Sequence, residues 1–298
     1  MQAHSTTVTG EELRAPHSTG TAPPRTAAPI DATDCHHHIF DPRFQKYGEI
    51  YVPSATVAEY QLFKRRLGLS RSIVVAPSNY GTDNSCLIDA LQQLGTTAAR
   101  GVAYVGPQVS DDEIKRLHEH GVRGLRIYLD KNQVPTHEQV RTLGKQAADQ
   151  GWSLQFVGTA RTEIFVEWQD SILNLPCSSV IDHFGWLPQP AGVNSKTAQT
   201  LYKLLDSGKV YVKLSGLYLS SAIGYPTYSD LDEVATRFIT LAPERIIWGS
   251  DWPHPMAMGK QQMPDGAMLF DRLAQWAQRD EVFQQILVGN PDRLYWAD

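Results

Sequence analysis

Cysteine is scarce in this sequence of 298 residues, and neither sign of charge dominates. The three cysteines, Cys35, Cys86 and Cys177, are odd in number and widely spaced, which favours a reducing compartment over a disulfide framework. A formal net charge of −5 argues against nucleic acid or an anionic membrane as the main partner. No run of about 18 apolar residues is present, so we expect no membrane span. These absences predict a cytoplasmic protein with a small-molecule partner, and they leave a homo-oligomer open.

The first 29 residues also lack a targeting signal. They are rich in Thr, Ala, Pro and Ser, without the apolar core of a secretory peptide, and Glu11 and Glu12 are unlike a transit peptide. We expect a flexible arm over residues 1–29. Capping of the bottom of the domain or of a neighbouring subunit is the alternative.

From residue 30 onward, short runs of β-branched or aromatic residues alternate with longer amphipathic stretches such as 57–68, 111–121 and 138–151. This alternation predicts one α/β domain over 30–298, a (β/α)8 TIM barrel. A doubly wound open sheet is the alternative, but its glycine-rich fingerprint is absent after the first strand. The eight expected strands are 30–39, 72–78, 101–106, 122–129, 152–158, 178–185, 210–216 and 245–251.

The first expected strand carries three consecutive histidines in the stretch DCHHHIF. Because strand side chains alternate between faces, Asp34, His36 and His38 are expected on one face, and Cys35 and His37 on the other. His37 is therefore expected to face the helical layer.

Two further strand ends carry polar residues, and in this barrel such ends meet at one mouth. His183, expected to share a face with Ile181, follows strand six, and Asp251 and His254 follow strand eight. Together with the first two inward histidines, His183 and Asp251 make a set of ligands suited to a single zinc ion.

Strand four is expected to point Gly124, Arg126 and Tyr128 into the barrel. A buried arginine needs an anion. Two interpretations remain open: an ion pair with an internal carboxylate such as Asp251, or a clamp for a substrate carboxylate or sulfonate.

Other polar residues of the same rim are candidates for contacting a substrate. Lys213 and Ser215 share the inward face of strand seven, and Ser78 ends strand two. The loop 41–53 carries Tyr47 and Tyr51 and is placed to cover the mouth. A structural role is the alternative for each of them.

The order of motifs along the chain resembles the lactonase branch of the amidohydrolase superfamily, which includes 2-pyrone-4,6-dicarboxylate lactonase, 4-sulfomuconolactone hydrolase and sugar-lactone hydrolases. The matching pieces are DCHHHIFDP, APSNYGTDN, ARGVAYVGP, GVRGLRIYL, VIDHFG, IIWGSDWPHP and VGNPDRLYW. They run through the whole chain after the arm.

The resemblance implies a distorted barrel that hydrolyses cyclic esters. It implies one divalent metal, with zinc expected, although the pyrone dicarboxylate lactonase works without a metal and its histidines polarise the carbonyl directly. Carried over by position, the metal-type and catalytic residues are His36, His38, His183 and Asp251, with Asp251 as general base; Arg126 binds a carboxylate, and Ser78 and His254 lie near the substrate.

Three departures concern the substrate. Trp186 and Val157 stand where the dicarboxylate lactonase has an arginine and a tyrosine, and 216–221 lacks its further arginine. A less charged lactone, with one carboxylate or several hydroxyls, is therefore expected.

The predicted function is hydrolysis of a muconolactone-like or sugar lactone by an activated water, in aromatic compound catabolism. A metal-dependent decarboxylase of an aromatic or muconate acid, or a sugar-lactone isomerase, is the alternative on the same scaffold.

Overall fold

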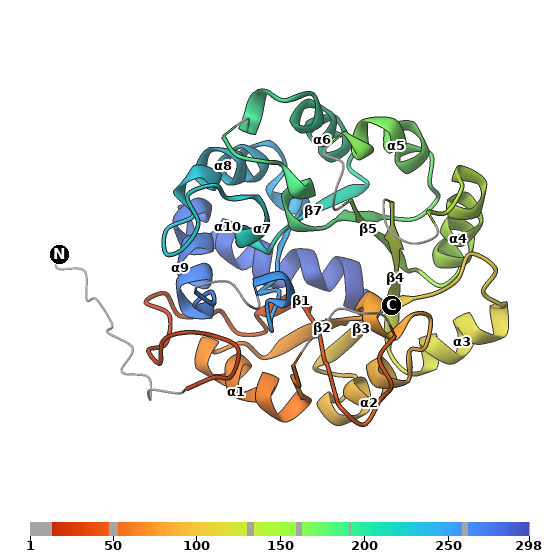
Figure 1. Cartoon of the computed structure of the whole chain (residues 1–298). Helices are drawn as coiled ribbons and strands as arrows, with labels where there is room; N and C mark the ends of the chain where they lie inside the picture. The colour runs from red at the N-terminus through yellow and green to blue at the C-terminus, as the bar shows by residue number, and fades with distance from the viewer. Residues whose placement is uncertain are drawn as a thin grey trace.

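The computed structural model describes residues 14–47, 53–129, 134–158, 163–190, 192–257 and 262–297. Parallel strands lie side by side in chain order at the centre, and helices form a ring outside them (Figure 1). This confirms the predicted single-domain (β/α)8 barrel and rules out the open sheet. The strands are β1 Thr33–His37, β2 Arg71–Val75, β3 Ala99–Tyr104, β4 Val122–Tyr128, β5 Ser153–Val157, β6 Ser179–Ile181, β7 Val210–Leu214 and β8 Ile246–Trp248.

The helices begin and end where the sequence supplies caps. Thr56 and Glu59 form a capping box at the start of α1, and Gly68 ends that helix with a φ of 72°. No helix in the described residues is long and apolar enough to cross a membrane. The helices are α1 Val57–Leu67, α2 Ser85–Leu94, α3 Asp111–Glu119, α4 His137–Asp149, α5 Ile164–Leu173, α6 Lys196–Asp206, α7 Leu217–Ser220, α8 Asp232–Leu241, α9 Gly266–Ala277 and α10 Asp280–Gln284.

Two apolar layers hold the barrel together. The larger lies between strands and helices and includes Leu125 and Ile127, as predicted for β4. The smaller one includes side chains from several strands together with Leu294 and Tyr295 from the C-terminal segment. Cys35 belongs to the smaller layer, so the prediction that it shares a face with His37, which stacks on Tyr60, is wrong.

Strand β1 departs from simple alternation. Its pairing with β2 shifts register between Asp34 and His37. Asp34 accepts a hydrogen bond of 3.0 Å from the hydroxyl of Tyr60 on α1, and the His37 ring stacks on Tyr60 at 3.5 Å. The predicted common face of Asp34, His36 and His38 is therefore wrong, because a bulge breaks the two-residue period. His37 faces the helical layer, as expected.

Residues 14–29 differ from the expected flexible arm, because they pack along the barrel. The buried guanidinium of Arg66 on α1 donates to the carbonyls of Thr19 at 2.8 Å and Ala22 at 2.9 Å. The indole of Trp252, just after β8, donates to the Pro16 carbonyl at 2.8 Å. A buried arginine thus ties this segment, which we call the strap (residues 14–29), to the barrel. Residues 1–13 lie outside the described residues.

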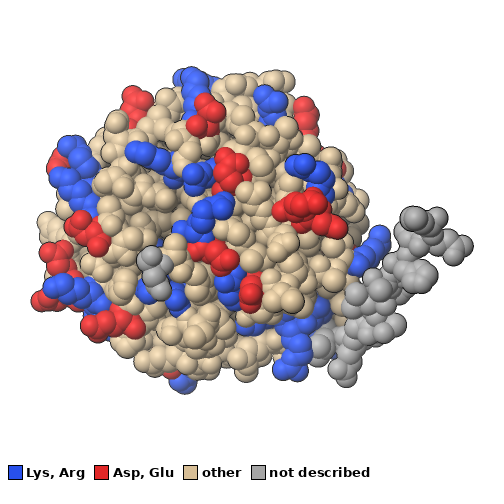
Figure 2. Space-filling view, turned by 180° about the vertical axis from the view of Figure 1, so that it is seen from behind, with Lys and Arg blue, Asp and Glu red and all other residues tan. Residues whose placement is uncertain are grey.

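Acidic and basic side chains are interspersed on the face of the molecule opposite to that of Figure 1 (Figure 2). This distribution agrees with the near balance of 27 basic and 32 acidic residues in the sequence.

Candidate active site

The structure brings His36, in β1, and His38, directly after β1, together with Asp251, which follows β8. His36 Nε2 lies 3.2 Å from His38 Nε2 and 3.5 Å from Asp251 Oδ1, and His38 Nε2 lies 3.6 Å from the same oxygen. The backbone holds this arrangement, since the Asp251 amide donates to the His36 carbonyl at 2.8 Å. All three side chains are buried. The predicted convergence of these two strand ends is therefore present.

His183 completes the imidazole cluster from the turn after β6. Its ring centre lies 4.6 Å from that of His36, and its Nδ1 lies 2.8 Å from the Ser215 hydroxyl. Strand β6 ends at Ile181, which packs in the larger apolar layer between strands and helices. The chain then turns with a φ of 53° at His183. The expected common face of His183 and Ile181 is therefore wrong, because strand alternation stops before the histidine.

Gly216 allows the close approach of this cluster. A Cβ added at this glycine would lie 2.8 Å from His183 Nδ1 and 3.3 Å from Asp251 Oδ2, and its φ is +59°. Both the space and the backbone conformation require glycine here.

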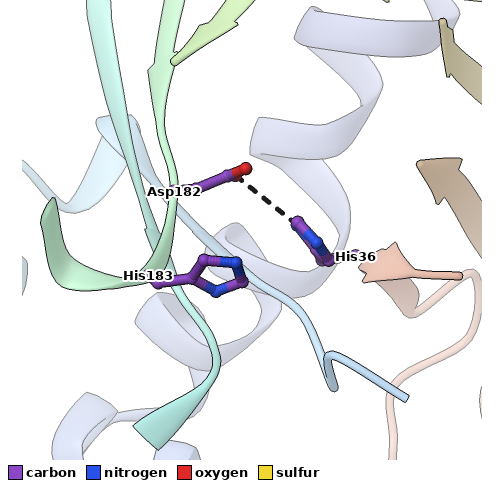
Figure 3. Close-up of side chains that lie close together, drawn as sticks. All are labelled: His36, Asp182 and His183. Atoms are coloured by element: carbon purple, nitrogen blue, oxygen red, sulfur yellow. Dashed lines mark ion pairs between the residues drawn. The ribbon is translucent and has the colours of Figure 1, made fainter. Parts of the chain in front are cut away.

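Asp182 is a central residue that the sequence reasoning missed. Its Oδ1 lies 3.5 Å from His36 Nδ1 and 3.0 Å from Lys213 Nζ, and its Oδ2 accepts from Gln155 at 2.9 Å. Figure 3 shows Asp182 pointing at His36 beside His183. Burial opposes its charge, but the Lys213 ammonium lowers the pKa of Asp182 well below the usual value. Two-residue spacing from the interior Val180 was the signal that could have found it.

Lys213 points inward, as predicted, but contacts protein atoms. Its fully buried Nζ lies 2.9 Å from Gln155 Oε1, 3.0 Å from Asp182 Oδ1 and 3.1 Å from His36 Nδ1. It does not line the cavity described below. The expectation that Lys213 holds a substrate oxygen is therefore not supported by its contacts.

Arg126 lies near Asp182 instead of pairing with Asp251. Its Nη2 is 3.5 Å from Asp182 Oδ2, and its Nη1 donates to the Ala76 carbonyl at 3.2 Å. Its buried Nε has no hydrogen-bond partner among the residues that the structure describes. One donor of the guanidinium is thus unsatisfied beside the cavity.

A cavity opens above this cluster and contains much of the predicted site. The residues expected there that line it are His38, Ser78, Arg126, Tyr128, His183 and Asp251. The other lining residues are Phe40, Pro77, Asn79, Val157, Trp186, Leu219, Pro255 and Met256. A larger hollow of about 630 Å³ between α6 and α8 contains none of the expected residues.

Besides Lys213, two predicted substrate contacts, Tyr47 and His254, lie outside the lining. Tyr47 is half exposed, and its amide donates to the carbonyl of the lining residue Asn79 at 2.5 Å. His254 is fully buried, and neither ring nitrogen has a hydrogen-bond partner within the described ranges. Its ring lies edge-on to Tyr218 at 5.8 Å. Tyr51 lies outside the described residues.

Burial sets the charge state of the cluster. It lowers the pKa of His36 and His38 well below the usual value and that of His183 to about 4. Burial also raises the pKa of Asp251 to about 7, against the opposing hydrogen bond from the Tyr218 hydroxyl. The site therefore holds neutral imidazoles around a carboxyl group that exchanges protons near neutral pH. Tyr218 was not predicted, and no motif in the sequence indicated it.

Candidate metal ligands form two overlapping groups in the described residues, which divide the four expected ligands and add Asp182. Ligand atoms of His36, His38 and Asp251 lie within 4.8 Å of one another, as do those of His36, Asp182 and His183. Asp251 Oδ1 has no hydrogen-bond partner in the described chain. These positions suit a divalent ion. The Lys213 contact at His36 Nδ1 does not suit a bound ion, because a histidine that binds a metal through Nε2 donates a proton from Nδ1.

A family model described as amidohydrolase matches residues 33–296, and the chain belongs to this family. The chain is 33% identical over 290 residues to a 2-pyrone-4,6-dicarboxylate hydrolase of Comamonas testosteroni, with 92% of this chain and 93% of that one covered. It is 30% identical over 291 residues to a 4-sulfomuconolactone hydrolase of Rhizobium radiobacter, with 92% and 93% covered. A crystal structure from Agrobacterium tumefaciens shares the fold, with a TM-score of 0.84 at 22% identity over 95% of this chain and 99% of that one.

Proposed function

We propose that this enzyme hydrolyses a small lactone that carries an acidic group. The observation that carries the proposal is Asp251 Oδ1, a buried and unpartnered oxygen at the cavity, 3.5 Å and 3.6 Å from two imidazoles. The names of the two relatives support it, because both contain a lactone-type substrate with an acidic group. They also favour a place in aromatic compound catabolism. The three buried, free cysteines favour the cytoplasm.

In the proposed reaction, Asp251 takes a proton from a water molecule, whose oxygen attacks the carbonyl carbon of the ring. The tetrahedral intermediate then expels the ring oxygen, and Asp251 returns the proton to it. A carboxyl group with a pKa of about 7 suits both directions of transfer. His183 lines the cavity, and we assign to it the stabilisation of the developing oxyanion.

The same cavity favours a ring with one anionic substituent. Arg126, with its unsatisfied Nε, is the proposed partner of that anion. Ser78 and Tyr128 line the same cavity, and the side chains of Trp186 and Leu219 are available to the ring. This composition supports a substrate less charged than a dicarboxylate.

The metal expected from the motifs, zinc, would take ligands from His36, His38, His183 and Asp251. It would supply a Lewis acid for the carbonyl. The steps above involve only protein groups. A histidine that binds a metal through Nε2 donates a proton from Nδ1, but His36 Nδ1 faces the Lys213 ammonium.

A pH-indicator assay on a lactone panel tests the proposal. The panel contains a pyrone dicarboxylate, a muconolactone, a sulfonated muconolactone and sugar lactones. We expect acid release from an anionic lactone and an about 10²- to 10⁴-fold lower kcat for Asp251→Asn with an unchanged melting temperature. Near-normal kcat in Asp251→Asn would refute its role as base.

The same samples separate the two alternatives. A decarboxylase would release CO₂ from an aromatic or muconate acid, and an isomerase would convert one lactone into another without releasing acid. Either result, with no hydrolysis on the panel, would overturn the proposed function.

A further inference from the structure

Lys213 Nζ forms two hydrogen bonds and one ion pair, all with buried groups. An ammonium has three N–H groups. Nζ lies 2.9 Å from Gln155 Oε1, 3.0 Å from Asp182 Oδ1 and 3.1 Å from His36 Nδ1, all fully buried. The orientation of the Gln155 amide agrees, because its nitrogen donates to Asp182 Oδ2 at 2.9 Å. An ammonium has no lone pair, so His36 Nδ1, at 3.1 Å from Nζ and 3.5 Å from Asp182 Oδ1, accepts from Lys213.

The position of one ring proton follows from this contact. A neutral imidazole has one N–H and one lone pair, so a His36 that accepts at Nδ1 carries its proton on Nε2. The contact of His38 with the Val75 carbonyl gives the same assignment. His38 Nδ1 lies 2.7 Å from the Val75 carbonyl, which only accepts, so His38 Nε2 holds a lone pair. The two Nε2 atoms are 3.2 Å apart and form a donor–acceptor pair.

The His36 proton thus lies where a divalent ion would lie. It faces two atoms with lone pairs, His38 Nε2 and Asp251 Oδ1, at 3.2 Å and 3.5 Å. An ion at the same place would need the lone pair of His36 Nε2, and the proton would move to Nδ1, where it would point at the Lys213 ammonium.

We propose that Lys213 is a positioning residue that fixes the Nε2–H form of His36, so that this proton is donated to His38 Nε2 and divalent metal binding is weakened. Lys213 lies 177 positions from His36 in the sequence, and Asp182 and Gln155 hold its ammonium in place. Neither the proton assignment nor its effect on metal affinity depends on the lactone reaction.

Long-range ¹H–¹⁵N spectra of protein labelled in the histidine rings test the assignment directly. The His36 signals are identified by their loss in His36→Asn. We expect the Nε2–H pattern in the wild-type protein and its loss in the double variant Lys213→Met/Asp182→Asn, which removes both buried charges together. An Nδ1–H pattern in the wild-type protein would overturn the proposal, whether or not the variant folds.

Zinc affinity, measured by competition with a chromophoric chelator, is the second readout. We expect zinc to bind the double variant, which keeps the ligand group His36, His38 and Asp251, about 10- to 100-fold more tightly than the wild-type protein. Lys203→Met, an exposed lysine on α6, is the matched control and should leave the affinity unchanged. Equal or weaker binding by the folded double variant would contradict the proposal. Neither measurement uses turnover. This proposal can therefore be wrong while the enzyme hydrolyses lactones, and it can be right if the enzyme does not.

Discussion

The Tyr218 hydroxyl donates a hydrogen bond of 2.5 Å to Asp251 Oδ2. The second carboxylate oxygen, Oδ1, has no such partner among the described residues and lies beside His36 and His38. The tyrosine therefore leaves one oxygen of the proposed base available at the cavity. It approaches from α7, a helix in which the sequence shows no catalytic motif.

The pH dependence of hydrolysis should follow the ionisation of Asp251. The proposed base acts only when ionised, and burial raises its pKa to about 7. We expect kcat/KM to fall about tenfold per unit as the pH decreases below this value and to level off above it. Initial rates across a series of buffers at constant ionic strength measure this acidic limb of the pH–rate profile. A flat profile from pH 5 to 8 would contradict the assignment.

Substitution Tyr218→Phe should move that limb to higher pH. In the wild-type protein the hydrogen bond from Tyr218 lowers the pKa of Asp251. Removing it should therefore raise this pKa by about one unit. Activity at pH 6 should then fall more than activity at pH 9. Tyr202→Phe, on α6 and not part of the cavity lining, serves as the control. An equal loss at all pH values would indicate a structural role only.

Arg126→Met should weaken the binding of anionic substrates selectively. A hydrogen bond to a charged group contributes about 1.5–3 kcal/mol, so KM should rise about 10- to 100-fold for an anionic lactone. A neutral lactone of similar size should show little change, which makes it the internal control. The same rise for both lactones would argue against the clamp.

Chelator treatment should leave turnover unchanged. The Lys213 contact at His36 Nδ1 disfavours an ion at His36, and the proposed steps use protein groups alone. Dialysis against EDTA, followed by metal analysis and a rate measurement, checks this expectation. Loss of activity that added zinc restores would show that the ion is required.

Arg66→Met should destabilise the protein. The buried guanidinium contacts two strap carbonyls and lies 2.7 Å from Asp265, and loss of one partner in such a pair costs about 3–5 kcal/mol. Urea unfolding measures the change. Arg65→Met, the exposed neighbour on α1, should stay within about 0.5 kcal/mol of the wild-type value. Equal stability of the two variants would show that the strap contributes little.

The sequence by itself determined the barrel and the location of its chemistry. Strand and helix periods are local properties, and each of the eight predicted strands is present. Because parallel strands of a closed barrel end at one mouth, residues as distant as His36 and Asp251 were expected to meet, and they do. The inward direction of Arg126 and Lys213 followed from the same period.

Only the tertiary structure decided how these side chains are connected. The bulge in β1 turns Asp34 toward Tyr60, and a positive φ directs His183, so neither direction follows a two-residue period. The partners of Lys213 come from β1, β5 and the end of β6, and Pro16 of the strap meets Trp252 across 236 positions. Hydrogen bonds between such distant segments depend on the packed arrangement of the whole barrel, which no local pattern encodes.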